Sequence, residues 1–227
     1  MTPRAVHFIR HAQGYHNINN DQTIPDPDLT PNGIQQCEHL AQTFPYFARI
    51  DLVCASPIRR AIQTAQTSMA PFLQSGKKKI LALPLAQEAP AEPANTPSGI
   101  QRLQEEYGSI VDFSRCLELS DYDSKTGAFA PDNDSLEGRA QALRRFLRDR
   151  DEEEVVVVSH GQFLHYVSRD VDEEGRQLGG DWENTEYRSY VFEPVGHVDA
   201  LLRETEESVS RRGASGPGCS MGSANKE

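Results

Sequence analysis

The chain has 227 residues, of which 37% are hydrophobic and 25% charged, and its formal net charge is −11 at pH 7. This charge argues against a surface for nucleic acid or for an anionic membrane, and no apolar run is long enough to cross a bilayer. The length favours a single α/β domain. No signal-peptide hydrophobic segment precedes the first predicted strand, so the expected compartment is the cytoplasm.

Along the chain, predicted strands alternate with predicted helices. The strands are expected at 5–9, 51–55, 79–83, 155–158, 187–193 and 198–202. The helices are expected after Thr30-Pro31, after Ser56-Pro57 with an apolar stripe as far as Phe72, at 101–107, at 136–147 and from Gln162. The all-valine run at 155–158 is typical of a central parallel strand that is buried on both faces. This order predicts a three-layer α/β/α sandwich with a mainly parallel central sheet.

The connections and the end of the chain have a different composition. Residues 84–98 are rich in Pro and Ala and are expected to form an ordered loop, whereas 121–134 is a polar loop. From Glu206 onward, Ser, Arg, Gly and Asn dominate without apolar periodicity. We therefore expect one catalytic domain at 1–205 and a disordered tail at 206–227.

Reactive or charged side chains follow four of the predicted strands. In chain order they are Arg10 and His11 with Asn17 beyond them, then Arg59 and Arg60, then Glu88, then His160. The carboxyl ends of parallel strands meet at one edge of a sheet, where such folds bind their ligands. Two histidines, an arginine pair and a carboxylate are therefore expected to converge there.

Phosphoryl transfer through a histidine suits this set of residues. Imidazole is a good nucleophile at neutral pH, and a transferring phosphoryl group carries its charge on oxygens that arginine and histidine donors can stabilise. A carboxylic acid can protonate the leaving oxygen. The sequence shows no Asp/His cluster with metal-ligand spacing, so neither a metal nor another cofactor is expected.

The motifs resemble those of the histidine phosphatase superfamily, in its phosphoglycerate mutase-like branch. RHAQGYHN is similar to the RHG signature, and SPIRRAIQTA, the carboxylate in LAQEAPAEP and VVVVSHG match later motifs in the same order. The segments DYDSKTGAFAPDNDSLEGRAQALRRFLRDR and NTEYRSYVF look similar to fungal members. The resemblance covers residues 6–192 and implies an α/β/α sandwich and a phosphohistidine intermediate.

The resemblance also implies a role for each matching residue. His11 is the expected nucleophile, Glu88 the expected proton donor, and His160 the third catalytic residue. Arg10, Asn17 and Arg60 are expected to hold the phosphate together with His160. Arg60 rather than Arg59 matches the family arginine, because it immediately precedes an alanine.

The chain departs from the family pattern at two places. Ala12 replaces the glycine of the RHG signature, which is a common variant. Ala94 and Asn95 stand where relatives often carry a Cys-Asp pair. That segment usually faces the substrate, so the resemblance implies an altered preference for the leaving group.

Several other polar residues have plainer interpretations. His7 and His165 are interpreted as structural, and His16 is a candidate for the wall of the pocket. Ser159 is not expected to act as a nucleophile, because no G-x-S-x-G elbow surrounds it. Glu92, in the same Pro-rich loop as Glu88, is the alternative proton donor. Asn184 and Glu186 are left without an assigned role.

The expected function is that of a metal-independent phosphomonoesterase acting on a small phosphorylated metabolite through a phosphohistidine intermediate. One alternative is phosphoglycerate mutase-type transfer to a second hydroxyl group, and another is a related reaction on a biosynthetic intermediate in the same pocket. A binding protein that keeps the fold without activity is a third. Neither the physiological substrate nor the oligomeric state follows from the sequence.

Overall fold

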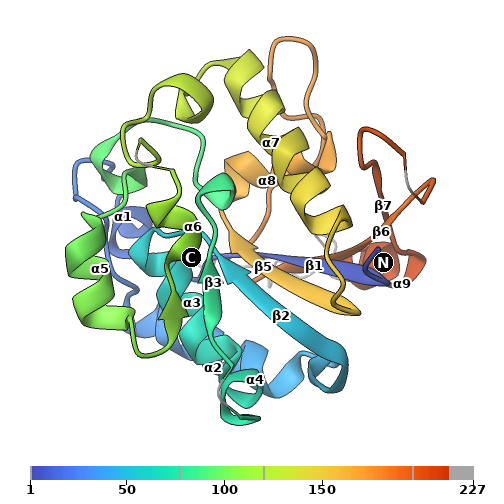
Figure 1. The fold of residues 1–227 in the computed structure, drawn as a ribbon, viewed down its shortest axis with the longest axis horizontal. Coiled ribbons are helices and arrows are strands. Elements are labelled where there is room, and N and C mark those ends of the chain that lie inside the picture. The colour runs from blue at the N-terminus through green and yellow to red at the C-terminus, as the bar shows by residue number, and fades with distance from the viewer. Residues whose placement is uncertain (1, 77, 120, 196, 215–227) are drawn as a thin grey trace, which may run out of the picture.

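A computed structural model describes residues 2–214 of the chain, except residues 77, 120 and 196. Its centre is a seven-stranded sheet with the strand order β4-β3-β2-β5-β1-β6-β7 (Figure 1). The strands are β1 (Ala5–Arg10), β2 (Ile50–Ala55), β3 (Ile80–Ala82), β4 (Val111–Asp112), β5 (Glu154–Ser159), β6 (Tyr187–Phe192) and β7 (Leu202–Glu204). Strands β1 to β5 are joined by parallel pairs, whereas β6 and β7 are antiparallel. The mainly parallel sheet predicted from the sequence is therefore confirmed.

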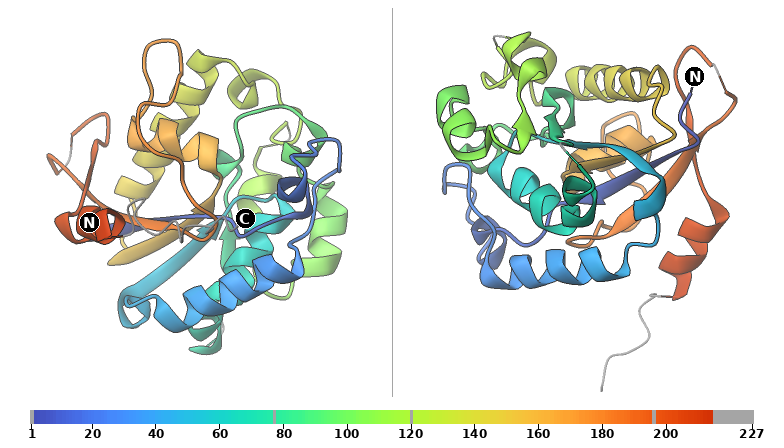
Figure 2. Two further views of the ribbon diagram at one scale, coloured as in Figure 1. Left: turned by 180° about the vertical axis from the view of Figure 1, so that it is seen from behind. Right: turned by 60° about the horizontal axis from the view of Figure 1, so that its bottom comes forward.

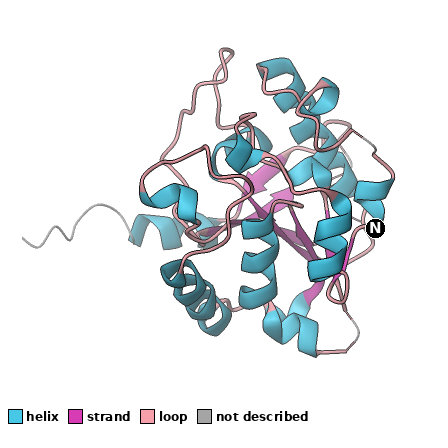
Figure 3. Ribbon diagram, turned by 90° about the vertical axis from the view of Figure 1, so that its left-hand side faces the viewer, coloured by secondary structure: helices cyan, strands magenta, loops and turns pink. Residues whose placement is uncertain are grey.

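Helices cover both faces of this sheet (Figures 1 and 3). The α-helices are α1 (Tyr15–Ile18), α2 (Pro31–Thr43), α3 (Arg59–Ser68), α4 (Ala70–Gln74), α5 (Ile100–Tyr107), α6 (Ser114–Leu117), α7 (Asn133–Arg148), α8 (Gly161–Ser168) and α9 (Glu206–Ala214). The 3₁₀ turns are η1 (Phe47–Arg49), η2 (Pro84–Ala86), η3 (Pro93–Asn95) and η4 (Gly127–Phe129). This arrangement is the predicted three-layer α/β/α sandwich.

The valines of β5 belong to both hydrophobic cores. Val155 and Val157 pack with residues of α7 and α8, whereas Val156 and Val158 pack with residues of α2, α3 and α5. All four side chains are fully buried. Because successive side chains of a strand point to opposite faces, a strand between two helical layers must be apolar at every position. Burial of each valine stabilises the fold by roughly 1.5 kcal/mol or more.

Helix α3 begins at Arg59, later than the Ser56-Pro57 start that the sequence predicts. The continuous helix expected from there to Phe72 is also divided, and α4 begins at Ala70 with Pro71 in its first turn. Proline lacks the amide hydrogen that a helix interior needs, so it favours a new helix start at this point. The first two residues of α3 are therefore Arg59 and Arg60, which follow the end of β2 after the short connection Ser56-Pro57-Ile58.

The last strand lies further along the chain than predicted. The sequence predicts a strand at 198–202, but β7 is Leu202–Glu204. Ala200 has a φ of 50°. A non-glycine residue in this left-handed region interrupts an extended strand, so β7 can begin only after it.

The sequence also predicts a disordered tail from Glu206, whereas the structure has helix α9 at Glu206–Ala214, at the β6–β7 edge of the sheet (Figure 2). The anchor of α9 is polar: the buried Ser208 hydroxyl accepts a hydrogen bond from the Ser189 amide at 3.0 Å and donates one to Glu204 at 2.7 Å. A search for apolar periodicity misses such an anchor. The remainder of the predicted tail, 215–227, lies outside the described residues. No helix in the described part of the chain has the length and apolar character needed to cross a membrane.

Candidate active site

The chain leaves the carboxyl ends of four parallel strands beside one another. Hydrogen bonds continue the sheet past the strand ends, from the His11 amide to the Ser159 carbonyl (2.9 Å) and from the Ser56 amide to the Val158 carbonyl (3.0 Å). The segment after β3 is held in the same way, because the Leu83 amide donates to a β2 carbonyl at 2.7 Å. These bonds fix the loops that carry the predicted site residues.

The imidazole of His11 is fixed in one tautomer. Its Nδ1 lies 2.7 Å from the carbonyl oxygen of Ala12, and a carbonyl can only accept, so Nδ1 carries the proton. Its Nε2 lies 3.1 Å from Nε of Arg60, which can only donate. Both contacts leave a lone pair on Nε2, as the predicted role of His11 as a nucleophile requires.

Burial keeps the site histidines neutral. His11 and His160 are both almost completely buried. Desolvation, followed by the positive charges of Arg60 and Arg10, lowers the pKa of His11 well below the usual value of a histidine. Desolvation and then Arg60 lower the pKa of His160 in the same way. A neutral imidazole keeps the lone pair that a nucleophile needs.

Arg60 connects the parts of the site. Its guanidinium group is fully buried, and burial lowers its pKa to about 10, so the group stays charged at neutral pH. It donates to Nε2 of His11 (3.1 Å), Nδ1 of His160 (3.0 Å), Oδ1 of Asn95 (2.9 Å) and the carbonyl oxygen of Ala94. The departure from the family pattern at Ala94 and Asn95 is thus in direct contact with this arginine.

Two buried donors beside His11 have no hydrogen-bond partner among the described residues. Because Nδ1 of His160 accepts from Arg60, its proton lies on Nε2, and that nitrogen is buried and unpartnered. The Nε of Arg10 is also buried and unpartnered. The rings of His11 and His160 have centroids 5.0 Å apart. Buried donors without partners are rare in folded proteins, and together they suit an anionic ligand.

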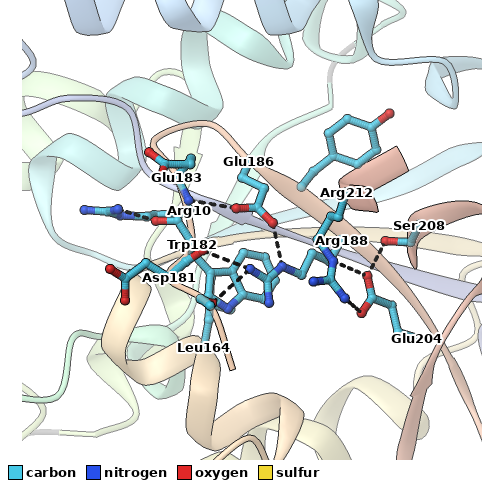
Figure 4. A network of polar contacts seen from close by, with 12 residues as sticks. Arg10, Leu164, Asp181, Trp182, Glu183, Glu186, Arg188, Glu204, Ser208 and Arg212 are labelled. Atoms are coloured by element: carbon cyan, nitrogen blue, oxygen red, sulfur yellow. Dashed lines mark hydrogen bonds and ion pairs between the residues drawn. The ribbon is translucent and has the colours of Figure 1, made fainter. Parts of the chain in front are cut away.

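The guanidinium group of Arg10 is held from the side of β6. Its Nη1 donates to the carbonyl oxygen of Trp182 (Figure 4). Arg188 stacks on the indole ring of Trp182 with its guanidinium carbon 3.9 Å from the ring centroid, and its Nε donates to Glu186 at 2.6 Å. Glu186, which the sequence leaves unassigned, therefore belongs to the support of Arg10.

Glu88 lies where the segment after β3 meets the start of α8. Its Oε1 accepts hydrogen bonds from the amides of Ala89 (2.9 Å) and Phe163 (3.0 Å), which leaves Oε2 available. Its backbone carbonyl accepts from Nζ of Lys125 (2.9 Å) and from Nη2 of Arg139 (3.2 Å). Sequence reasoning missed both cations, because one is a lone lysine in an Asp-rich loop and the other is one of four arginines in an amphipathic helix.

A cavity of about 310 Å³ opens in front of His11. Its lining includes four of the predicted site residues, Arg10, His11, Asn17 and Glu88. Asn17 accepts a hydrogen bond from the Gly14 backbone amide through Oδ1 at 3.0 Å, so its Nδ2 remains available as a donor. The other two predicted site residues, Arg60 and His160, are buried in contact with His11.

Of the other polar residues near His11, some line this cavity and others do not. His16, Glu92 and Asn95 line the cavity. Asn184, left unassigned from the sequence, donates from Nδ2 to the carbonyl oxygen of His11 at 2.8 Å. Arg59 is outside the lining and is mostly buried.

The partners of Arg59 explain its burial. Its guanidinium group forms ion pairs with Asp28 and Glu106. The interpretation of His7 and His165 as structural agrees with their contacts. His7 lies 3.1 Å from the buried Glu154, and His165 lies 3.0 Å from Asp170.

Comparison with known proteins connects this geometry with one superfamily. A family model described as the histidine phosphatase superfamily, branch 1, matches residues 6–75. A probable phosphatase of Schizosaccharomyces pombe is 25% identical over 70% of this chain and 74% of its own. A phosphoglycerate mutase-like protein of Arabidopsis thaliana is 26% identical over 89% of each chain.

Solved structures share the fold at lower sequence identity. The ecdysone phosphate phosphatase of Bombyx mori, in complex with tungstate, superposes with a TM-score of 0.64 at 17% identity, over 99% of this chain and 97% of its own. A mutant phosphoserine phosphatase of Entamoeba histolytica, in complex with phosphoserine, gives a TM-score of 0.53 at 22% identity, over 89% and 95% of the two chains. The family model and the curated relatives support the histidine phosphatase superfamily for this chain, and the solved structures share its fold.

Proposed function

We propose that this protein is a metal-independent phosphomonoesterase that acts on a small phosphorylated metabolite through a phosphohistidine on His11. One observation carries the proposal. The lone pair of His11 Nε2 is buried beside Arg60, and two unpartnered buried donors, on Arg10 and His160, accompany it. This arrangement offers a nucleophile together with donors for the oxygens of a phosphoryl group.

In the first step, Nε2 of His11 attacks the phosphorus atom. A P–N bond forms and the bond from phosphorus to the ester oxygen breaks. Arg60, Arg10 and His160 donate to the phosphoryl oxygens, whose negative charge is redistributed in the transition state. Glu88, acting from its protonated form, gives its proton to the departing oxygen, so that the product leaves as an alcohol.

In the second step, water attacks the phosphohistidine. The Glu88 carboxylate takes a proton from the water as the new P–O bond forms and the P–N bond breaks. Inorganic phosphate leaves, and His11 and Glu88 return to their starting states. Both steps use the carboxyl group of Glu88, whose Oε1 is fixed by two amides while Oε2 remains available.

The similarity to relatives supports the reaction class. The S. pombe relative is named a probable phosphatase and the A. thaliana relative a phosphoglycerate mutase-like protein, and both names fit phosphoryl transfer through the same kind of site. The two reactions differ only in the acceptor, which is water in one case and a second hydroxyl group in the other. Release of inorganic phosphate from a simple monoester separates them.

The test is a rapid-quench experiment with a ³²P-labelled ester. The wild-type protein should acquire acid-labile, base-stable phosphate on His11, located by peptide mapping, and His11→Ala should abolish both label and turnover. His39→Asn, a change at an exposed histidine of α2, is the matched control and should label normally. Turnover by a His11→Ala protein, or by an enzyme that never carries the label, would contradict the mechanism.

Chelation tests the metal-independent part of the proposal. No group of three or more His, Cys, Asp and Glu side chains in the described ranges is arranged to hold a metal ion. We therefore expect turnover of 4-nitrophenyl phosphate to continue in EDTA and to respond little to added Mg²⁺ or Zn²⁺. Activity that disappears in EDTA and returns with one metal would show a different chemistry.

A further inference from the structure

The lining of the cavity in front of His11 carries more negative than positive side chains. Arg10 lines it next to His11, and Arg60 and His160 are buried in contact with His11. Two carboxylates, Glu88 and Glu92, line the same cavity together with side-chain amides. Arg10 is the one lysine or arginine among the described residues that line this cavity.

The described residues that line the cavity include no second lysine or arginine for the leaving group. The Nη1 of Arg10 is bound to the Trp182 carbonyl, and its Nε, proposed to donate to a phosphoryl oxygen, has no partner among the described residues. Lys125 is outside the lining and donates to the backbone carbonyl of Glu88. His16 lines the cavity, but burial and the nearby arginines lower its pKa to about 3, so it is neutral at physiological pH.

The carboxylate of Glu92 is held in the lining of the cavity by a short chain of hydrogen bonds. Its Oε2 accepts from Nδ2 of Asn95 at 3.0 Å, and Oδ1 of Asn95 in turn accepts from Arg60 at 2.9 Å. Asn95 is buried, so this connection fixes the position of Glu92, whose side chain is exposed. Its Oε1 has no partner among the described residues and can accept from a ligand.

From this distribution of charge we infer that the cavity selects phosphomonoesters whose leaving alcohol carries no second anion, and that it favours an alcohol bearing an ammonium group next to Glu92. The inference rests on the proposed function and adds the substrate class. A carboxylate or a second phosphate on the leaving group would meet the carboxylates of Glu88 and Glu92 without a second lysine or arginine in the described lining. At the effective dielectric constant near a protein surface, this repulsion costs roughly one to two orders of magnitude in binding.

Three esters with leaving groups of two carbon atoms provide the test: 2-aminoethyl phosphate, 2-hydroxyethyl phosphate and phosphoglycolate. Their kcat/KM values should fall in that order, with roughly 10- to 100-fold between the ammonium and the carboxylate ester. Turnover of 4-nitrophenyl phosphate, which has no second charge, reports the phosphatase reaction separately. If the nitrophenyl ester is hydrolysed but the carboxylate ester is equal or preferred, the inference fails while the proposed function stands. If no ester is hydrolysed, both fail.

The three esters also differ in intrinsic reactivity. Comparing the ratio of their kcat/KM values between the wild type and variants cancels this difference. Glu92→Gln should lower the ratio of kcat/KM for the ammonium ester to that for the carboxylate ester by roughly tenfold, and Glu92→Lys should invert the preference. Glu105→Gln removes an exposed glutamate of α5 that is outside the cavity lining, and it should leave the ratio unchanged. A ratio that responds equally to Glu92→Gln and Glu105→Gln would reflect only the net charge of the protein and would overturn the assignment of Glu92.

Discussion

The Nε of Arg60 donates a hydrogen bond to Nε2 of His11 across 3.1 Å, so the lone pair proposed to attack phosphorus accepts from this arginine. An incoming phosphoryl group must replace this bond. The Arg60 N–H can then turn to a phosphoryl oxygen. The charge that, after burial, lowers the pKa of His11 then stabilises the transferring group. One arginine would in this way help to keep the nucleophile neutral and also bind the substrate.

Arg60→Lys should therefore damage the turnover of all phosphate esters alike. Lysine keeps a positive charge but lacks the planar fork that reaches His11, His160 and Asn95 together. We expect kcat/KM to fall by roughly 10²–10³-fold with both 4-nitrophenyl phosphate and an alkyl phosphate. The control is Arg59→Lys, which alters ion pairs outside the cavity and should leave both values within a few-fold. Circular dichroism spectra should show that both variants are folded. A loss confined to one ester would mean that Arg60 serves the leaving group instead.

Acid should destabilise the fold through its buried histidines. Burial is the largest cause that lowers the pKa of His7, His11, His16 and His160. Below about pH 6.5 these histidines become protonated in the unfolded chain but stay neutral in the folded protein. The free energy of unfolding therefore falls as the pH falls. Each such histidine adds a slope of about 1.4 kcal/mol per pH unit.

His16 is the histidine on which this slope can be measured, because its pKa of about 3 gives a wide pH window. Urea denaturation of His16→Asn between pH 4 and 6 should show a slope that is smaller by about 1.4 kcal/mol per pH unit than that of the wild type. His39→Asn, at an exposed position, should leave the slope unchanged. Equal slopes in wild type and His16→Asn would mean that His16 is protonated in the folded protein.

The sequence was informative where a residue's role is local or follows from the order of the strands. The run Val155–Val158 predicts a central strand, and the strand ends predict the convergence of Arg10, His11, Arg60 and His160 at one edge of the sheet. Contacts that join distant segments through single polar groups leave no pattern to find. The position of Lys125 at the Glu88 carbonyl and the anchoring of α9 through Ser208 are two such contacts.

Lys125 should make the free energy of unfolding depend on pH in the alkaline range. Burial, followed by the charge of Arg139, lowers its pKa to about 7. Between pH 7 and about 10.5 the unfolded chain holds a proton that the folded Lys125 has lost, so the free energy of unfolding should rise with pH across this range.

Lys125→Met should flatten this rise by about 1.4 kcal/mol per pH unit, measured by urea denaturation between pH 7.5 and 9.5. Lys79→Met is the matched control, because Lys79 also donates to a backbone carbonyl, that of Gly108, but is exposed. It should leave the slope as in the wild type. An unchanged slope in Lys125→Met would show that the Lys125 ammonium group keeps its charge in the folded protein.

The effect of Glu88→Gln should depend on the leaving group, because Glu88 is proposed to protonate the departing oxygen. A nitrophenolate leaves readily without a proton, whereas an alkyl alkoxide does not. We expect a small loss in the phosphorylation step with 4-nitrophenyl phosphate and a loss of roughly 10²–10⁴-fold with an alkyl phosphate. Since Glu88 is also proposed to activate the hydrolytic water, steady-state rates combine both of its roles, and the first step must be measured alone by burst kinetics. If Glu88→Gln slows that step equally for both esters, the proton comes from another residue. Glu92 lines the same cavity and is then the carboxylate to replace with glutamine.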